Sequence, residues 1–139
     1  MEETFPAALP FPPGVLHFPE GLPGFENLTD FTLLQEEQLL PIVFLVSVSE
    51  PRISFPAVPV QQLRPHYELQ LGEEDRLLLG LDEAEAAAGN LLCLAILNLG
   101  EGTQPATANL FAPLVVNPKN WTAKQVIQFD SSHSTAAEV

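Results

Sequence analysis

The sequence predicts an all-β fold: a compact antiparallel β-barrel or sandwich in a single domain, with one or two very short helices. Short runs rich in β-branched and aromatic residues recur along the chain, and Gly, Pro, Asn and Asp separate them. The chain has 139 residues, of which 46% are hydrophobic, so it can bury one core without disulfides or metals. We expect a flexible lead-in over residues 1–14, the barrel domain over residues 15–130 and a flexible tail over residues 131–139.

The first half of the domain supplies most of the predicted strands. The runs VLHF, FTLL, IVFLVSV and ISFPAV have the composition of strands. In HYELQL the apolar side chains of Tyr67, Leu69 and Leu71 alternate with Glu68 and Gln70. Such alternation is typical of a strand with one solvent-exposed face.

The helical signals are confined to the middle of the chain. Asp82 can cap the stretch DEAEAAAG, Glu85 three residues later completes a capping box, and Gly89 provides the exit. The preceding EEDRLLLG is expected to form another short turn.

Two hairpins are predicted in the second half. The run 91–99 is apolar on both faces, which predicts a central strand that is covered on both sides. It is expected to pair with 106–116 as a long antiparallel hairpin, and a second hairpin passes through NPKNWTAK into QVIQF. The predicted core includes Leu94, Ile96, Leu110, Ala112 and Leu114.

The charge of the chain excludes some classes of partner. Five Lys and Arg face 18 Asp and Glu, which gives a formal net charge of -13. Such a chain is unsuited to DNA, RNA or an anionic membrane, because these are bound through their phosphates by basic side chains. A basic macromolecular partner is one interpretation of the charge, and simple solubility is the other.

The acidic residues cluster between positions 68 and 85, where Arg76 is the only basic residue. Either they form one acidic docking face, or they are a solvated helix end whose carboxylates favour the helix N-terminus. The seven residues are Glu68, Glu73, Glu74, Asp75, Asp82, Glu83 and Glu85.

Motifs for catalysis or metal binding were not found, so we expect neither an enzyme nor a cofactor. The three histidines, His17, His66 and His133, do not have metal-ligand spacing, and there is no GxSxG nucleophile motif. Cys93 lies in the apolar run LLCLAIL and is expected to be a small buried residue. The start MEETFPAALP lacks a basic segment, and the longest apolar run is too short to span a bilayer, so we expect a cytoplasmic protein.

The stretch FPEGLPGFE, residues 18–26, contains two glycines and could be taken for a phosphate-binding loop. Glu20 and Glu26 would repel a phosphate, and no Lys or Arg precedes Arg52. The stretch therefore needs another explanation.

Several motifs, in this order, resemble those of the flagellar assembly factor FliW family. They are FPEGLPGFE, FTLL, FLVSVSEPRISFPAV, HYELQL, NLFAPLVVNPKN and KQVIQF, and they cover roughly residues 15 to 130. The resemblance implies a compact antiparallel β-barrel. It also explains FPEGLPGFE as a tight turn, in which Gly21 and Gly24 take positive φ, Pro19 and Pro23 fix their own φ, and the apolar side chains pack on the barrel.

The resemblance implies an interaction protein that is a monomer when free. FliW-like proteins bind CsrA, a basic RNA-binding translational regulator, and relieve its repression of flagellin translation, while flagellin binds as a competing partner. The acidic residues are then the candidate docking surface for CsrA. Val46 stands where the family usually has Gln, and the tail DSSHSTAAEV lacks the Tyr and Arg common in members. The competing interpretation, a small-ligand-binding barrel or an unrecognised enzyme, requires an internal pocket lined by His17, His66 or Tyr67.

Overall fold

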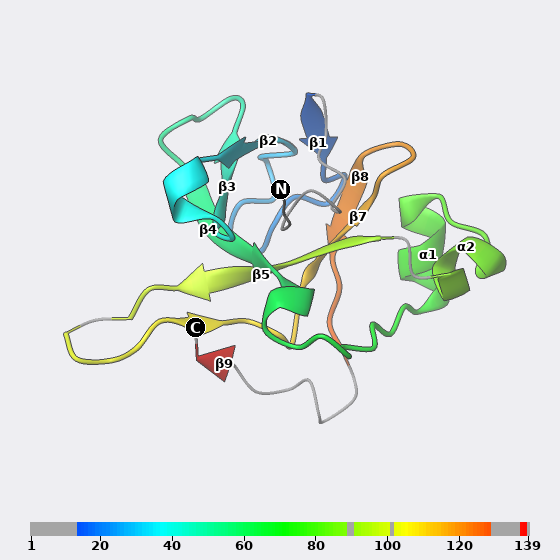
Figure 1. Cartoon of the computed structure of the whole chain (residues 1–139). Coiled ribbons are helices and arrows are strands. Elements are labelled where there is room, and N and C mark those ends of the chain that lie inside the picture. The colour runs from blue at the N-terminus through cyan, green and yellow to red at the C-terminus, as the bar shows by residue number, and fades with distance from the viewer. Residues whose placement is uncertain (1–13, 89–90, 101, 129–136, 139) are drawn as a thin grey trace.

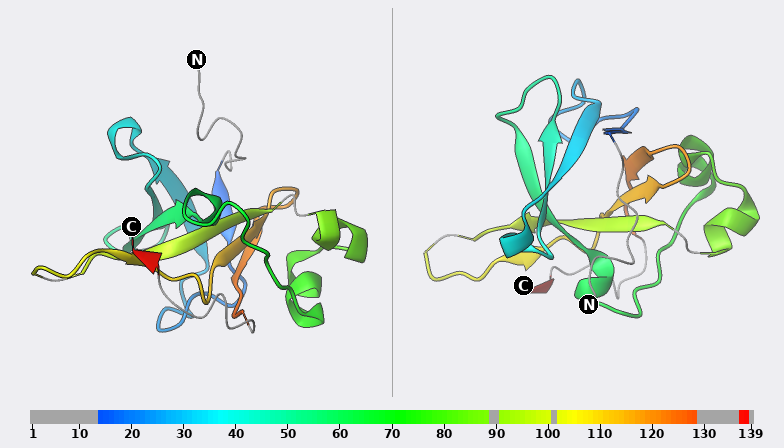
Figure 2. Two further views of the ribbon diagram at one scale, coloured as in Figure 1. Left: turned by 60° about the horizontal axis from the view of Figure 1, so that its bottom comes forward. Right: turned by 45° about the horizontal axis from the view of Figure 1, so that its top comes forward.

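A ring of hydrogen-bonded strands forms the body of the computed structural model, which describes residues 14–88, 91–100, 102–128 and 137–138 (Figures 1 and 2). The strands follow one another in the order β4, β3, β2, β1, β8, β7 and β5, and pairing between β4 and β5 closes the ring. The expected barrel is therefore confirmed. Its strands are β1 (Val15–His17), β2 (Asp30–Gln35), β3 (Val43–Ser47), β4 (Ser54–Pro59), β5 (Leu92–Asn98), β7 (Leu114–Asn117) and β8 (Thr122–Gln125).

One junction of the barrel is parallel. His17 in β1 pairs with Thr122 in β8, and the His17 N–H donates to the Trp121 carbonyl at 2.9 Å. The other strand pairs are antiparallel, as the sequence predicted. The parallel junction arises where the start of the domain meets the last strand of the barrel, a contact between distant parts of the sequence.

The predicted hairpin from 91–99 to 106–116 exists, but it is divided. Leu97 pairs with Ala108 in β6 (Thr107–Ala108), whereas Leu94 pairs with Leu114 in β7. Between these pairs β5 advances three residues (97 − 94) and the returning chain six (114 − 108), so an uninterrupted ladder is impossible. Asn109 fills the gap, because its side-chain oxygen accepts the N–H groups of Phe111 and Ala112, at 3.0 and 3.1 Å.

Strand β6 continues the sheet beyond the barrel and pairs with β9 (Ala137–Glu138). These two residues are the only described part of the expected flexible tail, and they are in a strand. Residues 1–13 of the expected lead-in lie outside the described residues. The second hairpin, β7 to β8, is present as predicted.

The two helices lie beside one end of β5, opposite the β5–β6 extension (Figure 1). In α2 (Glu83–Ala88) the predicted capping box is confirmed, since the Glu85 N–H donates to Asp82 Oδ1 at 2.7 Å and the Asp82 N–H donates to Glu85 Oε1 at 3.0 Å. Gly89, its predicted exit, lies outside the described residues. The stretch expected to be a short turn is a helix, α1 (Glu73–Leu79), which ends at Gly80 with φ of 75°. Two 3₁₀ turns, η1 (Glu37–Leu39) and η2 (Val60–Gln62), complete the elements.

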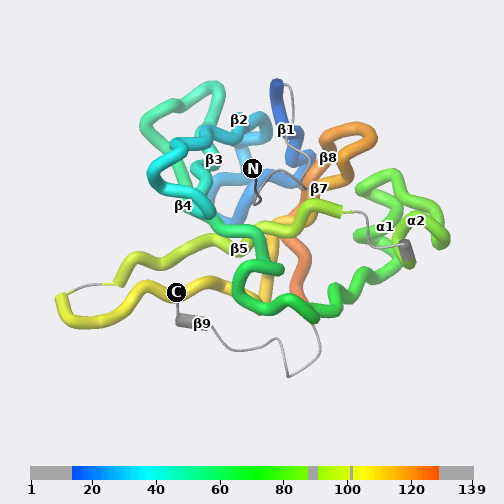
Figure 3. Tube along the Cα trace, viewed as in Figure 1, coloured from blue at the N-terminus to red at the C-terminus, as the bar shows by residue number. Residues whose placement is uncertain are grey.

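The strand predicted in HYELQL is wrong. Residues 67–71 are extended but belong to no sheet in the described structure. The buried side chain of Gln128 takes the place of a neighbouring strand, because it accepts the Gln70 N–H at 2.8 Å and donates to the Gln70 carbonyl at 3.0 Å. The alternation of burial is real, but an amide side chain rather than a β-ladder satisfies the backbone. Figure 3 shows this segment as part of the long connection between η2 and α1.

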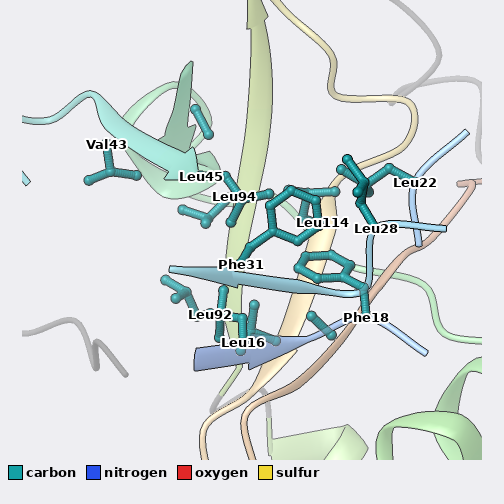
Figure 4. Packing of buried hydrophobic residues seen from close by; sticks show 13 residues of the cluster. Leu16, Phe18, Leu22, Leu28, Phe31, Val43, Leu45, Leu92, Leu94 and Leu114 are labelled. Carbon is teal, nitrogen blue, oxygen red and sulfur yellow. The ribbon is translucent and has the colours of Figure 1, made fainter. Parts of the chain in front are cut away.

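Strand β5 separates two parts of the core and is covered on both faces, as predicted. Leu92 and Leu94 contribute to a cluster inside the barrel, where Phe18 and Phe31 meet edge to face with ring centroids 5.4 Å apart (Figure 4). On the opposite face, Cys93 and Ala95 join a second cluster with residues of α1, β7 and the loops. Leu94, Leu110, Ala112 and Leu114 are buried as expected, and Ile96 is partly buried against the first cluster.

The stretch 18–26 forms two successive turns against the barrel. Gly21 has φ of 66° and Gly24 has φ of 85°. A Cβ on Gly21 would lie 2.6 Å from the Glu26 Cα, whereas a Cβ on Gly24 would meet nothing within 4 Å. Phe18 and Leu22 are buried in the barrel cluster, and Phe25 packs against it.

Candidate binding groove

An open groove of about 770 Å³ lies where the extended segment 67–73 passes the two helices and the start of β5. Its lining combines apolar side chains with three carboxylates and one guanidinium. The groove is an open surface feature, not the internal pocket that the ligand-binding alternative requires. It is lined by Gln61, Tyr67, Glu68, Leu69, Leu71, Glu73, Arg76, Glu83, Ala86, Ala87, Leu91 and Cys93.

The structure brings together three of the seven candidate acidic residues. Glu68 comes from the extended segment, Glu73 from the first turn of α1 and Glu83 from the first turn of α2, and all three line the groove. Arg76 lies among them, and its Nη1 donates to the Leu81 carbonyl at 2.8 Å, which holds the connection between the helices. The groove therefore has an excess of negative charge next to apolar side chains.

Asp75 faces the barrel instead. Its carboxylate lies 2.6 Å from Lys124 Nζ of β8, and both side chains are only 16% exposed. Hydrogen bonding to Asp75 is the main reason why the pKa of Lys124 is raised. Glu20, in the turn of FPEGLPGFE, is the second carboxylate near this lysine, at 3.6 Å. Asp75 thus joins α1 to the barrel, a structural task.

Glu85 and Asp82 are also occupied. The Asp82 N–H and the Lys119 side chain both bond to the Glu85 carboxylate, and they lower its pKa in that order of importance. Asp82 caps α2, and Glu74 is exposed on α1. The single acidic face considered from the sequence is therefore divided, because Lys119 and Lys124 arrive from the β7–β8 hairpin and meet two of its members.

Three of the other side chains that the sequence singled out, Tyr67, Cys93 and His17, have structural surroundings that account for them. The Tyr67 hydroxyl donates to the Leu110 carbonyl at 2.7 Å, and burial raises its pKa. Burial also raises the pKa of the Cys93 thiol to about 12, so it stays protonated and weakly nucleophilic at neutral pH. His17 Nδ1 lies 2.8 Å from Asp30 Oδ1, and His66 is exposed. Within the described ranges, no group of three His, Cys, Asp or Glu could hold a metal ion, while His133 lies outside them.

Two buried amides shape the groove and were missed in the sequence. Gln128 fixes the segment 67–73 through Gln70, as described above. Asn117 donates to the Leu79 carbonyl at 2.8 Å and accepts the Lys119 N–H at 3.0 Å, so it ties the end of α1 to the β7–β8 hairpin. Their signal is a polar residue at the end of an apolar run, in LVVN and QVIQ. That signal marks a buried hydrogen bond but does not identify its partner.

A small closed β-barrel with a surface groove is the class that this fold and site define. The model of the FliW protein family matches residues 11–139. The flagellar assembly factor FliW of Bacillus subtilis is 35% identical over 121 residues, 87% of this chain and 82% of that protein. That of Pseudothermotoga lettingae is 36% identical, over 86% of this chain and 74% of that protein.

A solved structure points to the same family. A crystal structure of the flagellar assembly factor FliW superposes with a TM-score of 0.76 and 29% identity, over 89% of this chain and 84% of that one. The chain belongs to the FliW family. In the part of the chain that the structure describes, no helix is both long and apolar enough to cross a membrane.

Proposed function

We propose that the chain is a cytoplasmic flagellar assembly factor that acts by binding proteins, not by catalysis. Its partner is a basic RNA-binding translational regulator of the CsrA type, which it keeps from repressing flagellin translation, and flagellin is the competing partner. Family membership supports the assembly role, since the similar proteins from Bacillus and Pseudothermotoga carry that name. The net charge of -13 supports a basic partner and disfavours direct contact with RNA.

The observation that carries the proposal is the combination of apolar side chains and carboxylates in the lining of the groove. Apolar surface supplies most of the free energy of association, and carboxylates at the rim steer a basic partner and reject acidic ones. Of the ion pairs among the described residues, none engages Glu73 or Glu83, whereas Asp75 and Glu85 are held by lysines. Glu73 and Glu83 are therefore the carboxylates that we expect to meet the partner.

The test is a binding-kinetics measurement with purified CsrA from the same organism at low and moderate salt. Replacing Glu73 and Glu83 together by Gln should slow association by about threefold to tenfold at low salt, since rim charges act mainly on the association rate. The difference should shrink as salt rises, because exposed charges are screened over about 8 Å at physiological ionic strength. Asp75 is left unchanged, because its replacement would remove the carboxylate that pairs with Lys124.

A matched control removes the same charge elsewhere. Glu36 and Glu37 are exposed beside η1, on the opposite side of the barrel from the helices (Figure 1). Their double Gln variant should bind like the wild type. If both double variants slow association equally, only the overall charge matters and the groove is not the docking surface. Binding of RNA by the isolated protein would overturn the mechanism.

A further inference from the structure

A second surface combines exposed apolar side chains with carboxylates. It is a hollow of about 350 Å³ between the turn of FPEGLPGFE and the two chain segments that precede β7 and follow β8. Glu20, Pro23 and Glu26 line it from the turn, and Phe111, Ala112 and Ile127 line it from the barrel. It shares no lining residue with the groove described above.

The backbone forces the apolar side chains of this hollow outward. The ladder of β7 and β8 continues past the strands, as the Val126 N–H donates to the Pro113 carbonyl at 2.9 Å and the Gln128 N–H to the Phe111 carbonyl at 2.7 Å. Val126 and Gln128 are buried, so Ile127 between them faces the other way and is 53% exposed. Phe111, exposed by 40%, lines the same hollow.

The opposite wall is a tight turn that its own hydrogen bonds hold together. Gly21 cannot carry a side chain without a clash with the Glu26 backbone, and the Phe25 N–H closes the turn on the Leu22 carbonyl at 2.7 Å. The Gly24 N–H donates to the Glu26 carboxylate at 3.0 Å and is the main reason why the pKa of Glu26 is lowered. A wall that is already ordered loses little entropy when a partner binds, which favours recognition.

The charge at the rim identifies the chemistry of the occupant. Glu20 and Glu26 are both exposed, and Lys124 lies 3.6 Å from Glu20 but is shared with Asp75 at 2.6 Å, so one cation faces three carboxylates here. A volume of about 350 Å³ is at the lower end for small-molecule sites and suits a large side chain of a protein segment. We propose that this hollow is a second docking site, which binds an extended partner segment with one large apolar side chain next to a lysine or arginine.

The test is an NMR titration of the ¹⁵N-labelled full chain with a capped peptide, Gly-Ser-Arg-Phe-Ser-Gly. Saturable shifts are expected at the amides of Gly21, Gly24, Phe111 and Ile127. Two control peptides, one with Glu in place of Arg and one with Ser in place of Phe, should each bind at least about fivefold more weakly, since each lacks one of the two recognised groups.

Matched variants locate the binding. Ile127→Ser should weaken the peptide at least about fivefold, as expected when an apolar anchor contact is lost. Leu77→Ser, a similar change at a side chain that is 62% exposed on α1, should leave it unchanged. The Glu73→Gln and Glu83→Gln variant of the groove should also leave it unchanged, which separates this site from the proposed function. Shifts that do not saturate, that lie outside the hollow, or that persist in Ile127→Ser would overturn the proposal.

Discussion

Replacing Gln128 by Ala removes the clamp that holds one wall of the groove. The side chain is fully buried, and its amide makes the 2.8 and 3.0 Å hydrogen bonds to both backbone groups of Gln70. A hydrogen bond contributes about 0.5–1.5 kcal/mol net, so two contribute about 1–3 kcal/mol. Gln70 is exposed, so water can replace the lost partner there and the penalty for a buried unsatisfied group is small.

We therefore expect the variant to lose about 2 kcal/mol of unfolding free energy, and somewhat more if the cavity left by the side chain persists. For a domain of this size, that loss lowers Tm by about 4–8 °C. Urea unfolding followed by circular dichroism measures the loss, and hydrogen exchange of the Gln70 amide reports the clamp itself. The control, Gln62→Ala, changes an exposed glutamine in η2 and should have little effect. If Gln128→Ala unfolds at the wild-type urea concentration and its Gln70 amide stays protected, the clamp contributes nothing and the reasoning is refuted.

Two further predictions concern the turn and the acid limit. Gly21→Ala should destabilise the fold more than Gly24→Ala does. Both variants place an alanine at positive φ, which costs about 1–2 kcal/mol, but only at position 21 would the new Cβ also lie 2.6 Å from a backbone atom, the Glu26 Cα. Equal urea midpoints would contradict this ranking. The folded-state pKa of Glu85 is lowered, so its contribution is complete above its unfolded pKa and disappears as pH falls through the lower folded value. In Glu85→Gln the free energy of unfolding should therefore fall less steeply than in the wild type as pH decreases below about 4.5. An unchanged slope in acid unfolding would contradict this prediction.

The strands of the barrel could be predicted because their signals are local. The runs before position 60 and the central strand at 91–99 carry composition and burial patterns that do not depend on their neighbours. The segment 67–71 shows the limit of this reasoning. Its alternation reports burial correctly, but the partner of its backbone is Gln128, 58 residues from Gln70.

The candidate site was harder to predict for the same reason. Seven carboxylates could be counted in the sequence, but their division depends on Lys119 and Lys124, which come from another hairpin. The ends of α1 and α2 point in directions that only the packed structure defines. Sequence reasoning therefore found the negative charge, and the fold decided which carboxylates pair with a lysine.

Lys124 does more than stabilise α1, because it also lies between the groove and the second hollow. Its ammonium group contacts both Asp75, which is two residues from groove residue Glu73, and Glu20, which lines the second hollow. A substitution at this one position would disturb both proposed docking surfaces at once and would mimic a shared interface. Genetic screens for loss of partner binding should therefore recover Lys124 whichever surface the partner uses, whereas variants at Glu73 and Glu83 or at Ile127 assign a partner to one of them.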